Sequence, residues 1–302
     1  PYNVASIVLA DGPAGLRLRS EYQVREDGSI DGGDFLDGFE NGYFAEPKEP
    51  TGTVYHQYCT AIPVGTLLAQ SWNLDLMKKL GQMIAGEMNE FEVTLWLAPG
   101  MSLHRNPLCG RNFEYYSEDP LLAGRMASAM TLGVQSVPGC GTTIKHYACN
   151  NQEDNRMGSD SILSERTLRE IYLKGFEIAI CNAQPMAMMT SYNLINGVHA
   201  ANSYDICTKA ARDEWGFEGA IMTDWTTTTD STAGECTAAG CMKAGNDMVM
   251  PGDMRDHESI RKALEDGSLD IRELKRCVYH TVKIILQSNQ YEDAVSYEKQ
   301  FK

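Results

Sequence analysis

Short apolar runs alternate with longer helical patterns along almost the whole chain, and this alternation limits the possible folds more than any other feature. Strands are predicted at 6–10, 93–98, 142–145, 185–190, 219–223 and 247–250. Helices are predicted at 66–90, 120–136, 164–182, 203–215, 231–244, 255–266 and 270–288. Strands separated by helices in this way predict a parallel sheet. The alternation by itself leaves two architectures open, a barrel and a doubly wound layer.

Two helix starts are marked by specific residues. Asp119 precedes Pro120, which combines an N-cap carboxylate with a ring that is preset for the first helical turn. Asp270 stands before apolar residues at helical spacing and is the predicted cap of the last helix.

Composition and charge exclude several classes of partner. The 302 residues are 43% hydrophobic, enough for one large α/β domain or two small ones. The net charge of −15 argues against nucleic acid and anionic membranes, because both require a basic surface. No apolar run approaches the length of a membrane span. A neutral or cationic small ligand fits this charge better.

The nine cysteines are scattered, odd in number and without a Cys-x-x-Cys pair. This usage predicts reduced thiols and a cytoplasmic location. Cys236 and Cys241 are close in sequence, but no histidine lies near them, so a zinc site is not expected there.

One segment departs from the alternation. Residues 20–58 are polar, acidic and rich in glycine, which predicts a long surface insertion in a single barrel domain covering 1–302. No Gly-x-Gly-x-x-Gly or Walker motif is present, so a nucleotide site is disfavoured.

Polar residues follow the ends of successive predicted strands. They are Asp11, Arg111, Lys145, His146, Tyr192 and Asp224. In a parallel barrel the carboxyl ends of the strands meet at one face, and active sites are built there. We therefore expect these side chains to lie close together.

Asp224 and Trp225 directly follow the apolar run 219–223. A carboxylate there can attack or stabilise an oxocarbenium-like carbon, while an indole can stack on the apolar face of a pyranose. An aspartate that only ends a strand or begins a turn would give the same sequence.

The other polar residues each allow two interpretations. Lys145 and His146 could donate hydrogen bonds to sugar hydroxyls, or be an ordinary lysine beside a core histidine. Lys145 could also form a Schiff base, as in aldolase barrels. Arg111 could clamp a ligand or a carboxylate, or simply pair with Glu114 or Glu118.

Four further positions are similarly open. Asp11 could accept bonds from sugar hydroxyls, or serve the turn that Asp-Gly-Pro predicts. Arg156 is the best candidate in the polar loop 150–156. Tyr192 could hold the carboxylate of the nucleophile, whereas Met189 is more often core filler.

Several long motifs occur in an order that resembles glycoside hydrolase family 3, over about residues 5 to 288. They are Asp-Gly-Pro-x-Gly-Leu-Arg, Gly-Arg-Asn-Phe-Glu-Tyr-Tyr-Ser-Glu-Asp-Pro, Lys-His-Tyr-Ala-Cys-Asn-Asn-Gln-Glu, Ser-Tyr-Asn-x-x-Asn-Gly and Thr-Asp-Trp. The resemblance is to the barrel domain of β-glucosidase-type members, and it implies an α/β fold, a TIM-like (β/α) barrel that is incomplete or irregular at its N-terminal end.

The resemblance also implies roles for individual residues. Asp224 aligns with the nucleophile that forms a covalent glycosyl-enzyme. The residues that align with the pocket for the non-reducing-end sugar are Asp11, Arg111, Lys145, His146, Met189, Tyr192 and Trp225. The implied activity is retaining, exo-acting hydrolysis of terminal β-D-glucosyl or xylosyl units, without a metal or an organic cofactor.

The same resemblance implies a partner domain. β-Glucosidase-type members take their acid/base glutamate from an α/β sandwich domain, and no segment after residue 290 matches one, so that domain is expected outside this chain. Two other functions remain open. The isolated barrel could bind sugar without turning it over, or Lys145 could make the protein a Schiff-base lyase.

Overall fold

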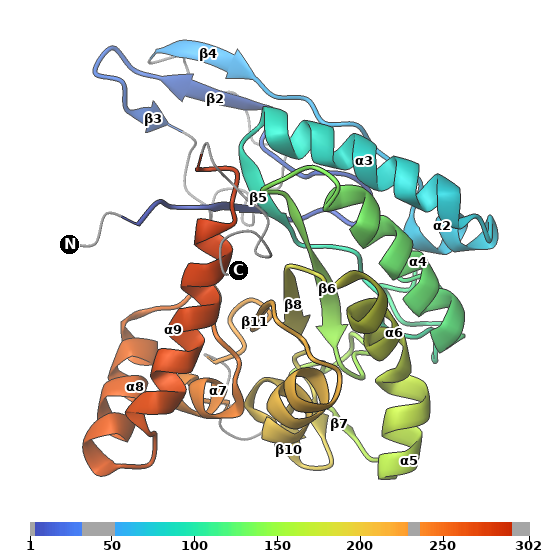
Figure 1. Ribbon diagram of the computed structural model, residues 1–302, viewed down its shortest axis with the longest axis vertical. Coiled ribbons are helices and arrows are strands. Elements are labelled where there is room, and N and C mark those ends of the chain that lie inside the picture. The colour runs from blue at the N-terminus through green and yellow to red at the C-terminus, as the bar shows by residue number, and fades with distance from the viewer. Residues whose placement is uncertain (1–3, 32–51, 229–235, 292–302) are drawn as a thin grey trace, which may run out of the picture.

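The computed structural model describes residues 4–31, 52–228 and 236–291. Its centre is a parallel sheet in the order β1 (Val8–Ala10), β5 (Val93–Trp96), β6 (Gly141–Tyr147), β8 (Ala187–Thr190) and β11 (Ala220–Met222) (Figure 1). A parallel bridge between Met222 and Met248 continues it. The order in space is the order in sequence, whereas a doubly wound sheet reverses direction at a switch point. The chain is therefore wound as a barrel.

The inner face of the sheet carries an apolar cluster. In-register pairing puts Lys145 beside Met189, and Met189 beside Met222, on this face. The cluster is formed by Ile7, Leu9, Leu95, Leu97, Met186, Ala187, Met189, Ala220, Met222, Trp225, Met248, Met250 and Ile284. Several of its members at the two edges of the sheet are only partly buried, and among the described residues β1 pairs with β5 alone. The barrel is thus incomplete, as the resemblance implies.

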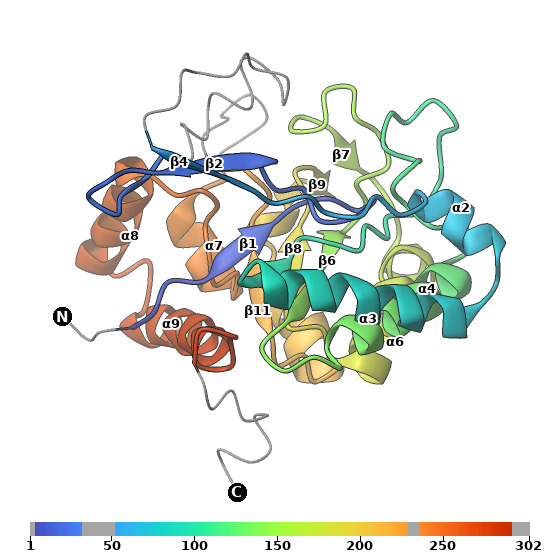
Figure 2. The same cartoon turned by 90° about the horizontal axis from the view of Figure 1, so that it is seen from above.

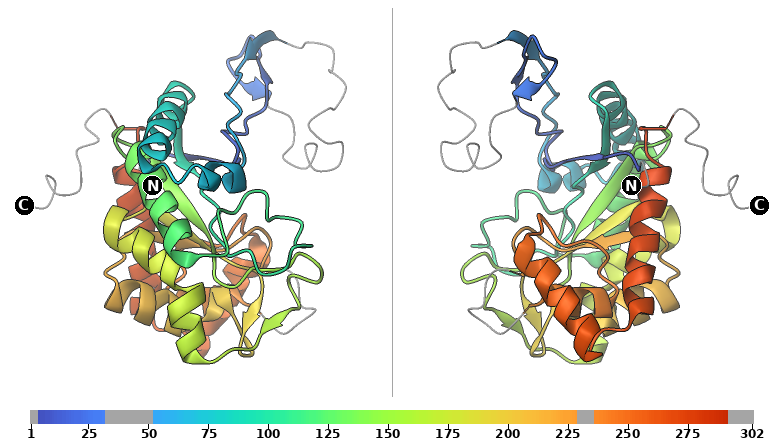
Figure 3. Two further views of the ribbon diagram at one scale, coloured as in Figure 1. Left: turned by 90° about the vertical axis from the view of Figure 1, so that its right-hand side faces the viewer. Right: turned by 90° about the vertical axis from the view of Figure 1, so that its left-hand side faces the viewer.

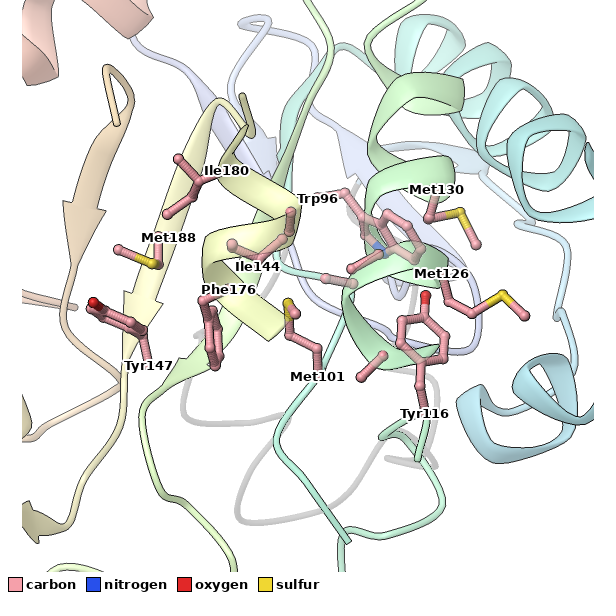
Figure 4. Close-up of a cluster of buried hydrophobic side chains, with 14 of the residues drawn as sticks. Trp96, Met101, Tyr116, Met126, Met130, Ile144, Tyr147, Phe176, Ile180 and Met188 are labelled. Atoms are coloured by element: carbon pink, nitrogen blue, oxygen red, sulfur yellow. The ribbon is translucent and has the colours of Figure 1, made fainter. Parts of the chain in front are cut away.

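Helices cover the outside of the sheet and the open edge of the barrel. They are α2 (Gly65–Gln70), α3 (Leu74–Glu90), α4 (Pro120–Val134), α5 (Glu165–Thr167), α6 (Lys174–Ala183), α7 (Ala238–Ala244), α8 (Met254–Asp266) and α9 (Ile271–Leu286). Figure 4 shows part of the main core, where Ile144 and Met188 of the sheet face Phe176 and Ile180 of α6. On the other side of the sheet, α9 contributes Ile284 to the inner cluster.

The strands and helices confirm most of the predicted elements, with three corrections. The helix predicted at 66–90 is broken: Trp72 has a φ of 53°, and the Asn73 side chain accepts from Leu76 N to begin α3. The helix predicted at 164–182 is divided by a π-helical turn, η1 (Leu168–Tyr172). The segment 247–250 forms only the bridge at Met248, not a strand.

The remaining expectations are met where the structure describes them. The Asp119 side chain accepts from Leu121 N, and Asp270 forms a capping box with Glu273. The helix predicted at 203–215 is the π-helix η3 (Asp205–Glu214), which follows a short 3₁₀ turn, η2 (Ala200–Asn202). Residues 231–235 of the helix predicted at 231–244 lie outside the described residues.

The predicted insertion at 20–58 contains a small antiparallel sheet. It consists of β2 (Glu21–Val24), β3 (Ile30–Asp31) and β4 (Thr53–His56), and residues 32–51 lie outside the described part of the chain. Figure 3 shows this sheet standing away from the barrel. A second small sheet joins β7 (Asp160–Ser161), β9 (Leu194–Ile195) and β10 (Val198–His199), and Figure 2 shows β7 and β2 on the side of the molecule away from α3 and α9.

All nine cysteines are free thiols. Of the helices in the described ranges, none has both the length and the apolar character needed to cross a bilayer.

Candidate active site

The two-residue period of the strands places three charged side chains at the same mouth of the barrel. Successive residues of a strand point to opposite faces, so residues two apart share a face. Met222 is inside the barrel, and Asp224 is two residues further on. Leu9 stands in the same relation to Asp11, while Lys145 shares the inner face with its β8 neighbour. The convergence predicted from the sequence is therefore present.

Asp11 is held by two cations. Lys145 Nζ donates to its Oδ1 at 2.7 Å, and the guanidinium of Arg17 binds its Oδ2. The loop between them is compact because Gly12 has a φ of 117°, and a Cβ on it would lie 2.0 Å from the carbonyl oxygen of Gly15. Burial opposes the charge of Asp11, but Lys145 and Arg17 outweigh it and lower the pKa of the carboxyl. Asp11 thus serves both the turn and the site.

Asp224 is 5% exposed and its two oxygens differ. Oδ1 accepts from the backbone N–H of Trp225 at 2.8 Å. Oδ2 is buried and has no hydrogen-bond partner among the described residues, although His146 Nε2 is 3.4 Å away. Burial raises the pKa of Asp224, and the charges of Arg111 and Lys145 offset this only in part. One carboxylate oxygen is therefore left without a partner inside a cationic site.

Arg111 forms the ion pair that was one of its two sequence interpretations, and its role as a clamp stays a prediction. Its Nε binds Glu114, which confirms one of the two predicted acidic partners, and Glu118 is exposed. Its Nη2 also lies 3.1 Å from His146 Nε2. The ion pair with Glu114 thus holds the guanidinium in the site.

His146 is 1% exposed and lies between Arg111 and a phenol. The hydroxyl of Tyr115 is 2.9 Å from Nδ1. Burial lowers the pKa of His146 well below its ordinary value, and the nearby charges of Arg111, Lys145 and Arg156 lower it further. The imidazole is therefore neutral at pH 7.

Tyr192 and Arg156 lie against each other next to these residues. The Arg156 guanidinium lies 4.3 Å from the centre of the Tyr192 ring, and its Nη1 donates to Glu153 at 2.8 Å. Burial raises the pKa of Asp224, and Tyr192 is one of the groups that oppose this rise, but its role in holding the carboxylate stays a prediction. The polar loop 150–156 therefore contributes Arg156 to the site.

Met189 and Trp225 pack on the apolar interior just below the charged residues. Met189 is fully buried in the inner cluster, which agrees with its interpretation as core filler. Trp225 is partly buried against the same cluster. Its stacking on a sugar stays a prediction.

Four residues of the site were not singled out from the sequence: Glu114, Tyr115, Asn150 and Glu153. Asn150 donates to the hydroxyl of Tyr115 and to Glu153, both at 3.0 Å. It therefore links Tyr115, the neighbour of His146, to Glu153, the partner of Arg156. All four residues belong to the sequence motifs quoted above. Only Glu114 could have been found from local sequence, because its spacing from Arg111 predicts an ion pair. Within the described residues, no three His, Cys, Asp or Glu side chains gather as a metal site.

The sequence profile of the Glycosyl hydrolase family 3 N terminal domain matches residues 47–284. The chain belongs to glycoside hydrolase family 3. This match covers well over half of the chain, and it includes every site residue described above except those of the Asp11 loop.

Named relatives and solved structures agree with the family. Beta-glucosidase A of Butyrivibrio fibrisolvens is 51% identical over 166 residues, which are 55% of this chain and 20% of the relative. An Exo-alpha-(1->6)-L-arabinopyranosidase of Bifidobacterium breve is 42% identical over 226 residues, 75% of this chain and 29% of that protein. The structure of beta-glucosidase 3B from Thermotoga neapolitana in complex with alpha-D-glucose matches with a TM-score of 0.80 at 40% identity, over 96% of this chain and 37% of that one. This chain thus spans between a fifth and two fifths of these proteins.

Proposed function

We propose that this domain supplies the nucleophile and the sugar-binding residues of a retaining β-glycosidase that removes terminal β-D-glucosyl or β-xylosyl units. The observation that carries the proposal is the state of Asp224. Its Oδ2 is buried and unpartnered among the described residues, while Oδ1 is fixed by a backbone N–H. A carboxylate held in this way has one oxygen oriented and the other available to attack C1.

The cations around Asp224 support this role. Burial raises the pKa of Asp224, and Arg111 and Lys145 work against that shift. They favour the ionised form that a nucleophile requires. The same guanidinium and ammonium groups are donors to sugar hydroxyls, and the charged carboxylate of Asp11 is an acceptor for them. The half-buried indole of Trp225 is the proposed platform for the apolar face of the sugar.

The leaving oxygen needs a proton from a second carboxyl group. In retaining glycosidases the two carboxyl groups are about 5 Å apart. Glu114 is buried in an ion pair with Arg111, which suits it to orienting the guanidinium. We propose that the acid/base glutamate comes from an α/β sandwich domain, as the family resemblance implies.

Sugar binding and turnover separate this function from its runner-up, a barrel that binds sugar without catalysis. Hydrolysis of 4-nitrophenyl β-D-glucoside and binding of glucose would be measured on this chain, with and without an added sandwich domain. Turnover that appears only with the added domain supports the proposal. Glucose binding with no turnover in either case supports the binding module instead.

The sugar itself is tested by a panel of nitrophenyl glycosides. One relative is named for β-glucosides and another for arabinopyranosides, so glucoside, xyloside and α-L-arabinopyranoside would be compared. We expect the highest kcat/KM for the glucoside. A higher value for the arabinopyranoside would replace glucose as the proposed sugar.

Lys145 gives the least favoured alternative, a Schiff-base lyase. Its Nζ donates to Asp11 at 2.7 Å, a geometry that favours a hydrogen-bond donor over a free amine. Borohydride trapping of a carbonyl compound on Lys145 would support the lyase.

A further inference from the structure

The Tyr115 hydroxyl contacts His146 but not Asp224. It lies 2.9 Å from His146 Nδ1, on the side of the imidazole away from Asp224. The residue is fully buried, and its ring meets the imidazole edge-on, with the two centroids 5.9 Å apart. The hydroxyl of Tyr115 therefore reaches Asp224 through His146, while its ring lies 6.0 Å from the guanidinium of Arg111.

The contacts of His146 determine where its single proton sits. Two neighbours of Nε2 favour opposite states of this nitrogen: Arg111 Nη2, 3.1 Å away, carries only donors and favours a lone pair, whereas Asp224 Oδ2, 3.4 Å away, can accept and favours a proton. A neutral imidazole with an unprotonated Nε2 has its proton on Nδ1. That N–H then points to the oxygen of Tyr115, which has two lone pairs and also accepts from Asn150.

We propose that Tyr115 is a positioning residue that keeps the His146 proton on Nδ1 and a lone pair on Nε2. The inference rests on the proposed role of Asp224 as the nucleophile. Nε2 is 3.4 Å from Asp224 Oδ2. A proton on Nε2 would hydrogen-bond to that oxygen and weaken it as a nucleophile, whereas a lone pair leaves it available to attack.

The surroundings hold Tyr115 in this position. Gly100 lies against its ring, and a Cβ there would be 3.0 Å from Cδ1 of the tyrosine. The Asn150 amide is oriented by Glu153, because the carboxylate can only accept, so an N–H and not a carbonyl faces the phenol. The phenol thus has fixed neighbours on both sides of its oxygen.

The tautomer can be read directly by nitrogen NMR of the chain labelled with ¹⁵N-histidine. The chain has six histidines, and the His146→Gln variant identifies the signals of His146 by their loss. We expect a protonated Nδ1 and an unprotonated Nε2 in the wild-type chain. An Nε2–H tautomer in the wild-type chain would overturn the proposal without the need for any Tyr115 variant.

Tyr115→Phe tests the cause of the tautomer. Loss of the hydroxyl removes the acceptor of the Nδ1–H group, so the imidazole proton of His146 should move to Nε2. The rate of glycosyl transfer to Asp224 should then fall roughly tenfold, about the effect of losing one buried hydrogen bond. Tyr116→Phe is the matched control, because Tyr116 is also buried but lies beside Met126 in the hydrophobic cluster (Figure 4). Both variants would first be checked for folding by circular dichroism.

The outcomes separate this inference from the proposed function. A Tyr115→Phe chain that keeps Nδ1–H overturns the role of Tyr115. A tautomer that moves as expected supports that role, even if Asp224 accepts no sugar in any variant. The latter result would contradict only the proposed function.

Discussion

Lys145 Nζ donates to Asp11 Oδ1 across 2.7 Å, although the two residues are 134 positions apart in the sequence. Asp11 follows β1 and Lys145 belongs to β6, with β5 between the two strands. Their ion pair therefore crosses β5 and ties the edge strand β1 to the middle of the sheet at the mouth of the incomplete barrel. It joins the stability of this end of the barrel to the proposed sugar site.

Lys145→Met is expected to lower both stability and glucose affinity. Removal of the ammonium leaves Asp11 with Arg17 as its cation, and about 2 kcal/mol of the free energy of unfolding should be lost. This is less than for a fully buried pair, because the Asp11 side chain is 32% exposed. Urea unfolding and calorimetry with glucose measure the two effects. Lys243→Met on the exposed face of α7 is the control, and equal losses in both variants would contradict the account.

Asp224→Asn is expected to make the chain more stable at neutral pH. The pKa of Asp224 is raised on folding, so the folded state disfavours the carboxylate that exists above the ordinary value of 3.8. Any stability that the Asp224 carboxyl contributes to the folded state is fully present below pH 3.8. That contribution is lost as the pH rises through the raised pKa of the folded state. The advantage of the variant should therefore shrink as the pH falls toward 3.8. Thermal unfolding across this range checks it, and an advantage that grows in acid would have the wrong sign.

Glu114→Gln is expected to weaken sugar binding roughly tenfold while leaving the chain folded. The change removes the ion pair that holds Arg111 in the site, and one charged hydrogen bond has about this effect. Glu118→Gln is the matched control, since Glu118 is the other acidic residue of the same loop and is exposed. Equal affinity in the two variants would show that Glu114 does not position the guanidinium.

Asp247→Asn is expected to destabilise the chain without changing sugar affinity. The side chain of Asp247 is fully buried. It forms an ion pair with Arg212, and its carboxylate lies 2.9 Å from His280 Nδ1. It also accepts from Ile221 N, near the start of β11, whereas Asp224 follows the end of that strand. Leaving Arg212 without its carboxylate should lower the free energy of unfolding by about 3 kcal/mol. A loss of glucose affinity in a folded variant would contradict this separation of the two ends.

The sequence predicted the parts of the site that strand geometry controls. Asp11, Lys145 and Asp224 follow from the ends of apolar runs, because parallel strands bring those ends to one face. Glu114, Tyr115 and Asn150 lie in loops, and loop conformation depends on contacts from distant parts of the chain. Gly100, for example, makes room for the ring of Tyr115 from another loop. No local pattern in the sequence contains that contact.

The departures in the fold have the same origin. Residues 66–90 carry one continuous helical pattern, but the positive φ of Trp72 and the cap at Asn73 divide it. The apolar run at 247–250 looks like the other strands, yet it lies at the edge of the sheet and bridges only at Met248. A strand needs a partner on at least one side over several residues, and the sequence of the strand does not report whether that partner is present.

The central claim is that Asp224 attacks the sugar, and 2,4-dinitrophenyl 2-deoxy-2-fluoro-β-D-glucoside tests it on this chain alone. Its leaving group departs without a proton, so no acid/base glutamate is required, and the fluorine slows release of the sugar from the enzyme. Mass spectrometry of the digested chain locates the label. We predict one fluoroglucosyl group on the peptide that contains Asp224, and none in Asp224→Asn. An adduct on another carboxylate such as Glu114, or no adduct in a chain that binds glucose, would contradict the account.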